Sequence, residues 1–192
     1  MAERPGHKIP GAGKSSFELI DSPRLFSELN LQKGSSFLDM GCGNGSYALT
    51  ASQWIGDEGV IYAIDLWEEG IETLRKSVSD RGIKNIRAMA GDISRRTHIK
   101  NGSVDVCLLA AVLHDIKDAD AALREISRVL KPGGTLAVME FKKMDGPPGP
   151  PIHIRMTPED VEKRVIPCGF RKERIIDIGP YNYLIMFSVR SR

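Results

Sequence analysis

Glycines and a carboxylate between residues 39 and 45 form the most informative segment of the sequence. Asp39 is followed by Gly41, Gly43 and Gly45, at the end of the short apolar run 37–40. Glycines at such a turn let the backbone come close to a ligand. The dinucleotide fingerprint GxGxxG/A needs a glycine or alanine where Ser46 stands, and a carboxylate beside the turn repels a pyrophosphate. The segment therefore favours a ligand that carries an ammonium group.

A second acid follows at the spacing expected of a ribose-binding residue. Asp65 ends the next apolar run and lies 20 residues after Gly45. Its two oxygens can accept hydrogen bonds from adjacent hydroxyl groups, and a capping role is the alternative. Leu66 and Trp67 come next and could cover an adenine ring, although Trp67 could equally belong to the core.

A third acid follows the next apolar run, in the sequence Gly91-Asp92-Ile93. Asp92 could accept a hydrogen bond from the exocyclic amine of adenine while Ile93 packs on the ring. Taken alone, Asp92 is as easily explained as the cap of a helix. The three acids are expected at the same end of one sheet, which favours the ligand explanation.

His114 and Asp115 follow the fourth apolar run and are the candidates for proton transfer. Histidine titrates near neutral pH, so His114 could act as a general base that Asp115 orients, or Asp115 could act itself. The alternative is that His114 caps a turn or packs beside the ligand. The histidines and cysteines are too dispersed to predict a metal site.

The apolar runs alternate with amphipathic segments along most of the chain. Such alternation predicts a parallel sheet with helices on both faces. The last two strands are joined by a short turn, so the final strand should be antiparallel. The sequence thus predicts an α/β, Rossmann-like fold: a seven-stranded, mostly parallel sheet with one antiparallel strand near the edge. The expected strands are 37–40, 60–64, 86–90, 104–111, 135–141, 171–178 and 183–189. The expected helices are a short one that starts at Asp21-Ser22-Pro23, followed by 46–55, 69–79, 119–130 and 157–168. The last helix is capped by Thr157, with Glu159 one residue short of capping-box spacing.

The composition is typical of a globular protein and gives no indication of a nucleic-acid-binding or membrane protein. The chain has 192 residues, 41% of them hydrophobic, and a net charge of +2. These values predict one globular domain with no overall basic excess for nucleic acid. No apolar stretch approaches the roughly 20 residues of a membrane-spanning helix. The scattered cysteines fit a reducing, cytoplasmic location.

Taken together, these segments resemble the class I S-adenosylmethionine-dependent methyltransferases. The matching pieces, in order, are LDMGCGNG (38–45), the strand that ends in Asp65, GDI (91–93), VDVCLLAAVLHDI (104–116) and LKPGG (130–134). The stretch AALREISRVLKPGG and the tail that begins GPPIHIRMTPEDVEKRV resemble the subgroup of ubiquinone and menaquinone biosynthesis enzymes, the type 11 methyltransferases.

The resemblance implies a cofactor and a role for each site residue. The cofactor would be S-adenosylmethionine, with S-adenosylhomocysteine as product. The implied binding residues are Asp39 near the methionine ammonium, Gly41, Gly43 and Gly45 under the methionine and ribose, Asp65 on the ribose with Leu66 beside it, Gly91, Asp92 and Ile93 around the adenine, and Ala110, whose backbone faces the methionine end.

The methyl acceptor is left open by the resemblance. A small molecule is expected, and the alternatives are an RNA or protein methyltransferase, a catalytically silent cofactor-binding module and, less favoured, a nicotinamide oxidoreductase. A monomer and a homodimer both fit the sequence. Residues 36–192 are expected to form the methyltransferase domain, and residues 1–35, with His7 and Phe17, a helix and lid. The Gly- and Pro-rich loop at 143–156 should wall the acceptor pocket, where His153 and Arg155 either meet an acidic acceptor or are solvated.

Overall fold

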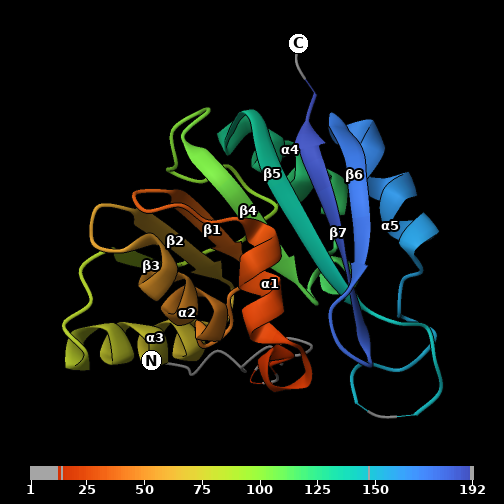
Figure 1. Ribbon diagram of the computed structural model, residues 1–192, viewed down its shortest axis with the longest axis horizontal. Coiled ribbons are helices and arrows are strands. Elements are labelled where there is room, and N and C mark those ends of the chain that lie inside the picture. The colour runs from red at the N-terminus through yellow and green to blue at the C-terminus, as the bar shows by residue number, and fades with distance from the viewer. Residues whose placement is uncertain (1–12, 14, 147, 191–192) are drawn as a thin grey trace, which may run out of the picture.

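Seven strands form one sheet that lies between two layers of helices (Figure 1). The structure is a computed structural model that describes residue 13 and residues 15–146 and 148–190. The strand order is β3-β2-β1-β4-β5-β7-β6. β7 is antiparallel to both of its neighbours, and the pairs from β3 to β5 are parallel. The predicted fold class is confirmed, with the antiparallel strand one place in from the edge.

The strands and helices alternate as the apolar pattern predicted. The strands are β1 (Ser36–Met40), β2 (Val60–Asp65), β3 (Ile86–Ala90), β4 (Val104–Ala110), β5 (Leu130–Phe141), β6 (Phe170–Asp177) and β7 (Asn182–Val189). The helices are α1 (Ser22–Leu29), α2 (Ser46–Ile55), α3 (Glu68–Asp80), α4 (Ala119–Val129) and α5 (Pro158–Val165), with the short 3₁₀ turns η1 (Phe17–Leu19), η2 (Leu113–Asp115) and η3 (Ile166–Cys168).

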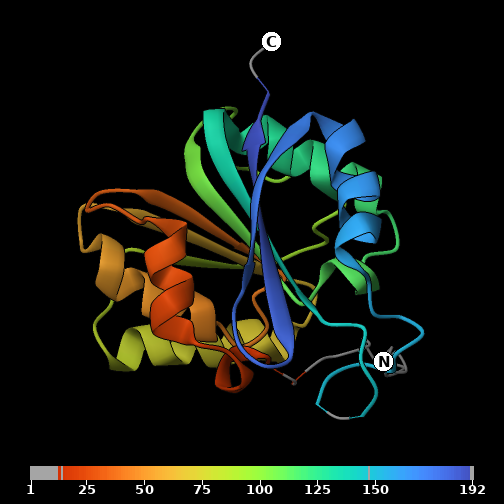
Figure 2. The same cartoon turned by 45° about the vertical axis from the view of Figure 1, so that its right-hand side comes forward.

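Each face of the sheet is covered by its own helices (Figure 2). On one face α1, α2 and α3 contribute buried residues such as Phe26, Ala48 and Leu74. On the other face α4 and α5 contribute Leu123 and Val161. The central strands β1 and β4 are therefore buried on both sides, which is why they are nearly continuous apolar runs.

Two boundaries differ from the sequence-based expectation by more than one residue. β5 begins at Leu130, five residues early, because Leu130 pairs with Val104 and the register then shifts between Val104 and Val106. The helix expected to run to Cys168 ends at Val165. Its amino end has a complete capping box formed by Thr157 and Asp160. Glu159 lies one residue short of that spacing, as expected, and the sequence analysis did not identify Asp160 as the partner.

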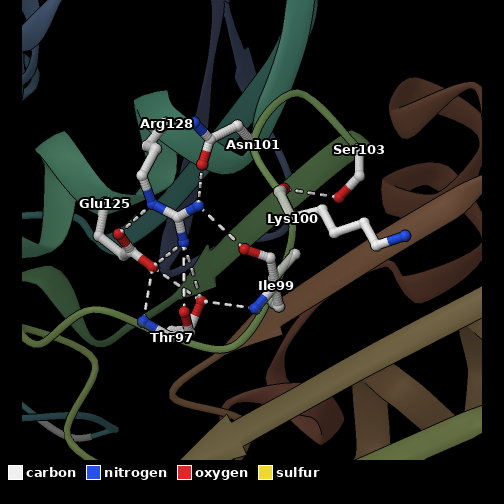
Figure 3. A network of polar contacts seen from close by, with 7 residues as sticks. All are labelled: Thr97, Ile99, Lys100, Asn101, Ser103, Glu125 and Arg128. Atoms are coloured by element: carbon white, nitrogen blue, oxygen red, sulfur yellow. Dashed lines mark hydrogen bonds and ion pairs between the residues drawn. The ribbon is translucent and has the colours of Figure 1, made fainter.

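The segment between β3 and β4 is fastened to α4 by an arginine network (Figure 3). Arg128 forms an ion pair with Glu125, and its guanidinium also donates to Ile99 O and Asn101 Oδ1. Glu125 Oε1 accepts from the backbone and hydroxyl of Thr97, both at 2.7 Å. This network lies beside the start of β4.

The carboxyl ends of β1 to β5 share the opposite edge because these strands are parallel; we call it the carboxyl edge. The start of β7 lies there too, since Asn182 pairs with Phe141. Part of the amino-terminal segment packs nearby: Phe17 contacts the ring of Tyr47 edge-on, with 5.1 Å between centroids, and Ser16 Oγ lies 2.8 Å from the Tyr47 hydroxyl. His7, the other residue of the predicted lid, lies outside the described residues.

Candidate functional site

The glycine turn after β1 is left-handed at alternate residues. Gly41, Gly43 and Gly45 have φ values of +83°, +55° and +83°. A Cβ on Gly41 would lie 2.6 Å from a methyl carbon of Val112, whereas a Cβ on Gly43 would meet nothing within 4 Å. The turn is thus closely packed at Gly41 and open at Gly43, which we call its tip. A ligand can therefore approach the backbone at Gly43.

Asp39 is fully buried beside this turn. Its Oδ2 accepts a hydrogen bond from Ala48 N at 3.0 Å, while its Oδ1 has no partner among the described residues. Burial raises the pKa of Asp39 to about 7; the charge of Asp65 adds to this, and the Ala48 bond opposes it. A buried carboxylate with an unsatisfied oxygen is costly, so a cationic or hydrogen-bonding ligand would stabilise it.

Asp65 holds the tip of the turn. One carboxylate oxygen accepts from Gly43 N at 2.7 Å, and the other accepts from Trp67 N at 2.8 Å. Each oxygen retains a lone pair, so the side chain can still accept from two adjacent hydroxyls. Leu66 is 51% exposed beside it. Trp67 is half-buried, and its ring lies 2.3 Å from where a Cβ on Gly70 would be.

The segment after β3 forms a compact turn. Gly91 N donates to Asp65 O at 2.8 Å, which joins this turn to the second acid. Asp92 accepts from the hydroxyl and the amide of Ser94, and these two bonds hold the pKa of Asp92 below its usual value. Ile93 is buried. Asp92 caps no helix, because no helix begins in the described segment between β3 and β4, so the helix-cap alternative was wrong. Its contacts here are those of a turn, and a ligand contact remains a prediction.

The segment after β4 bridges the glycine turn and β5. Ala110 ends the strand opposite Met139, and Ala111 follows in the left-handed region at φ +56°, donating its N–H to Met139 O. Val112 then packs on Gly41. A left-handed alanine is a strained conformation, and such strain is concentrated at functional sites.

His114 lies in the next turn, against a buried glutamate. Its Nδ1 is 2.7 Å from Glu140 Oε2, its backbone N–H donates to Glu140 Oε1, and its Nε2 is 3.5 Å from Asp115 Oδ2. Burial alone would lower the pKa of His114, but the hydrogen bond and charge of Glu140, helped by Asp115, outweigh it and raise the pKa above its usual value. Glu140 is fully buried at the end of β5. The Nδ1–Glu140 contact leaves Nε2 as the nitrogen able to accept a proton from a substrate.

Two residues of this region, Glu140 and Asn182, were not predicted from the sequence. Glu140 could have been found, because it is an acid inside the otherwise apolar run LAVMEF. Asn182 carried no such signal; it is fully buried, its Nδ2 donates to Glu140 O, and its Oδ1 is the second unpartnered buried oxygen of the described residues. Both unpartnered oxygens therefore lie at the carboxyl edge.

The loop after β5 differs from expectation at one residue. His153 is exposed, as its solvated alternative required. Arg155 is buried, with 4% of its surface exposed, so the expectation of a solvated side chain was wrong. Its guanidinium donates to loop carbonyls and has no N–H left for an acidic acceptor.

The described residues contain neither a membrane-spanning helix nor a metal-binding cluster. Among them, no helix combines the length and apolar character required to cross a bilayer. No group of three or more histidine, cysteine or acidic side chains is arranged there to hold a metal ion.

The donor set at the carboxyl edge fits S-adenosylmethionine. The orphaned Asp39 Oδ1 suits its ammonium group, and the remaining lone pairs of Asp65 suit its ribose hydroxyls. The open tip at Gly43 gives the backbone room to approach it.

Comparisons with known proteins agree with this fit. The curated relatives include a demethylmenaquinone methyltransferase from Geobacillus kaustophilus, 30% identical over 60% of this chain and 49% of the relative. Another is the ubiquinone/menaquinone biosynthesis C-methyltransferase UbiE from Shewanella sp. (strain W3-18-1), 33% identical over 57% of this chain and 44% of the relative. The chain thus spans about half the length of these curated relatives.

A solved structure covers nearly the whole chain. It is a SAM-dependent methyltransferase from Aquifex aeolicus, 27% identical, with a TM-score of 0.85 over 94% of this chain and 93% of that chain. The family described as "Methyltransferase domain" matches residues 31–166. The predicted resemblance and the predicted cofactor are confirmed: the chain belongs to the methyltransferase domain family, within the S-adenosylmethionine-dependent methyltransferases.

Proposed function

We propose that the chain transfers a methyl group from S-adenosylmethionine to a small-molecule acceptor, and that the acceptor is a ring carbon of a quinol. The similarity to quinone-biosynthesis C-methyltransferases supports the acceptor class. The observation that carries the site is the buried His114–Glu140 pair beside a glycine turn with an unsatisfied carboxylate.

The cofactor residues are proposed to act by position and charge. Asp39 receives the ammonium group, Asp65 receives the ribose hydroxyls, and Gly43 brings the backbone close. Leu66, Gly91, Asp92, Ile93 and Ala110 complete the set around the adenine and the methionine. When bound, S-adenosylmethionine supplies an electrophilic methyl group whose bonding electrons stay on the departing sulfur.

His114 is proposed as the general base. A quinol ring carbon becomes a better nucleophile when the neighbouring hydroxyl loses its proton, and we propose that His114 Nε2, the ring nitrogen that Glu140 does not engage, accepts that proton. After methyl transfer, the hydrogen of the methylated ring carbon leaves as a proton and the oxygen regains one, so that the aromatic ring is restored and one proton in all is released. Glu140 holds the ring through Nδ1 and stabilises the positive charge that the ring gains. Asp115 lies near the same Nε2 and helps to orient the ring. A positioned base of this kind contributes about 10²–10⁴-fold in rate.

The test is a single-turnover assay with methyl-labelled S-adenosylmethionine and five acceptors: a short-chain demethylmenaquinol, catechol, an alkyl amine, a thiol and arsenite. We expect label on the quinol carbon. His114→Ala should lower that rate by about 100-fold or more while leaving the dissociation constant of S-adenosylhomocysteine unchanged.

His98→Ala is the matched control, because His98 is exposed on the segment between β3 and β4. Label on another acceptor would overturn the quinol assignment. Cofactor binding with no label on any acceptor would favour a silent cofactor-binding module. A full rate in His114→Ala would remove His114 as the base.

A further inference from the structure

Arg155 is a buried cation whose partners are carbonyl oxygens. It is 4% exposed, and within the described residues its guanidinium hydrogen-bonds to no carboxylate. It lies 5.7 Å from the centroid of the Phe141 ring. A long charged side chain is seldom buried unless its charge is satisfied, so the site must provide strong acceptors.

Those acceptors come from alternate residues of one loop. The guanidinium has five N–H groups, and each donates to a different carbonyl. The acceptors and distances are Lys142 O at 3.1 Å, Met144 O at 2.9 Å, Gly146 O at 2.9 Å, Pro148 O at 3.0 Å and Pro150 O at 2.8 Å. Every second carbonyl therefore points inward, and the loop curls around one cation.

The loop has few means of holding this shape by itself. Residues 147, 148, 150 and 151 are prolines, which have no N–H to donate to another carbonyl. Gly149 has φ +105°, and a Cβ there would lie 2.6 Å from the Phe141 ring, so glycine lets the loop rest on that ring. Backbone hydrogen bonds tie the two ends of the loop, from Met144 N to Lys142 O and from Ile154 N to Pro151 O, whereas the carbonyls of Gly146, Pro148 and Pro150 accept from Arg155.

Both ends of the loop are held close to Glu140 of the proposed catalytic pair His114–Glu140. Lys142 follows directly on β5, two residues after Glu140. After Arg155, the carbonyl of Met156 accepts from the Tyr183 hydroxyl at 2.8 Å. Tyr183 is the register partner of Glu140 in the sheet.

The loop also borders an open hollow. Its lining consists of Asp145, Gly146, Gly149, Pro150, Pro151, Ile152 and Arg155. Apart from the acid and the buried arginine, this lining is made of glycine, proline and isoleucine. Ile152 is 40% exposed there, so the lining presents an apolar side chain to solvent.

We propose that Arg155 is a positioning residue that shapes this hollow to hold the apolar part of the methyl acceptor. The proposal rests on the quinol acceptor proposed above. Lysine cannot replace Arg155, because an ammonium has three donors for five carbonyls. Loosening the loop should weaken acceptor binding, while the cofactor residues on β1 to β4 are unaffected.

The experiment compares Arg155→Lys and Ile152→Ser with the control Arg128→Lys. Arg128 also organises a loop, but beside the start of β4 (Figure 3). Three quantities are measured: cleavage before Asp145 by an Asp-specific endoproteinase, the KM and kcat for the short-chain demethylmenaquinol, and the dissociation constant of S-adenosylhomocysteine.

We expect Arg155→Lys to speed the cleavage and to raise KM about tenfold with kcat within about twofold, the pattern of lost ground-state binding. Ile152→Ser should raise KM without faster cleavage. Arg128→Lys should change neither quantity, and cofactor binding should stay the same in all three variants.

An unchanged cleavage rate in Arg155→Lys would overturn the proposal that Arg155 holds the loop in shape. Faster cleavage with an unchanged KM would overturn the role of Arg155 in acceptor binding. If the wild-type protein does not methylate the quinol, the acceptor assignment is refuted instead. The cleavage measurement would still show whether Arg155 holds the loop in shape.

Discussion

Asp39 and Asp105 are acids on adjacent central strands, and they are partnered in opposite ways. Asp105, near the start of β4, accepts from Ser36 N and Oγ and from Lys131 Nζ. Burial would raise the pKa of Asp105, but these bonds hold it below its usual value. Asp39, near the end of β1, has one backbone bond, one orphaned oxygen and a pKa raised to about 7.

This difference indicates that the edge beside the start of β4 contributes to stability, whereas the carboxyl edge is suited to binding a ligand. Beside the start of β4, Arg128 and Glu125 satisfy each other and Thr97 (Figure 3). At the carboxyl edge, Asp39 Oδ1 and Asn182 Oδ1 have no hydrogen-bond partner within the described part of the chain, and Ala111 is in a strained conformation. A protein gives up stability in this way where a ligand will complete the contacts.

The largest expected effect is a change in the pH dependence of stability in Asp39→Asn. Because the folded pKa of Asp39 lies above its unfolded value, the wild-type protein loses stability as pH rises from about 4 to about 7. Between pH 4 and pH 8 it should lose about 1–4 kcal/mol more free energy of unfolding than Asp39→Asn. Urea titrations at the two pH values measure this, and equal losses would contradict the raised pKa.

Asp105→Asn should have a smaller effect of the opposite sign. The folded pKa of Asp105 lies below its unfolded value, so its stabilisation is present above the unfolded pKa and is lost as pH falls through the folded one. Since the side chain is 34% exposed, we expect a loss of about 1 kcal/mol at pH 7 and less at pH 3. Unfolding curves test this, and a weakened affinity for S-adenosylhomocysteine would break the separation of the two edges.

The smallest expected effect is a shift of the pH–rate profile in Glu140→Gln. Removing the negative charge lowers the raised pKa of His114, so the neutral base persists to lower pH. The acid limb of single-turnover methyl transfer should move to lower pH. Asp115→Asn, which changes a weaker contact at 3.5 Å, should move it less. An unmoved limb in both variants would exclude His114 as the titrating base.

Much of the fold could be predicted because buried strands and helix faces require apolar residues at regular positions in the sequence. β1 and β4 are covered on both faces, so their apolar runs marked the strands within a residue. The start of β5 could not be predicted, because Pro132 and Gly133 are typical of a turn and the pairing of Leu130 depends on a register shift in its neighbour.

Residues of the candidate site could be predicted from the sequence where they stand in short local motifs. The glycine turn, Asp65 and His114 stand at strand ends and are visible as motifs. Asn182 and Arg155 act through partners brought close only by the sheet and the loop, so no local pattern marks them. Arg155 was misjudged because an isolated arginine in a Pro-rich loop is normally solvated.

The most direct test of the carboxyl edge is the pH dependence of S-adenosylhomocysteine binding, measured by calorimetry between pH 5.5 and 8.0. If the ionised Asp39 receives the ammonium group, wild-type affinity should rise about tenfold as pH passes through about 7. Asp39→Asn should bind more weakly, with little dependence on pH, whereas Asp105→Asn should follow the wild-type curve. Parallel curves for the wild type and Asp39→Asn would contradict the assignment of Asp39 to the cofactor.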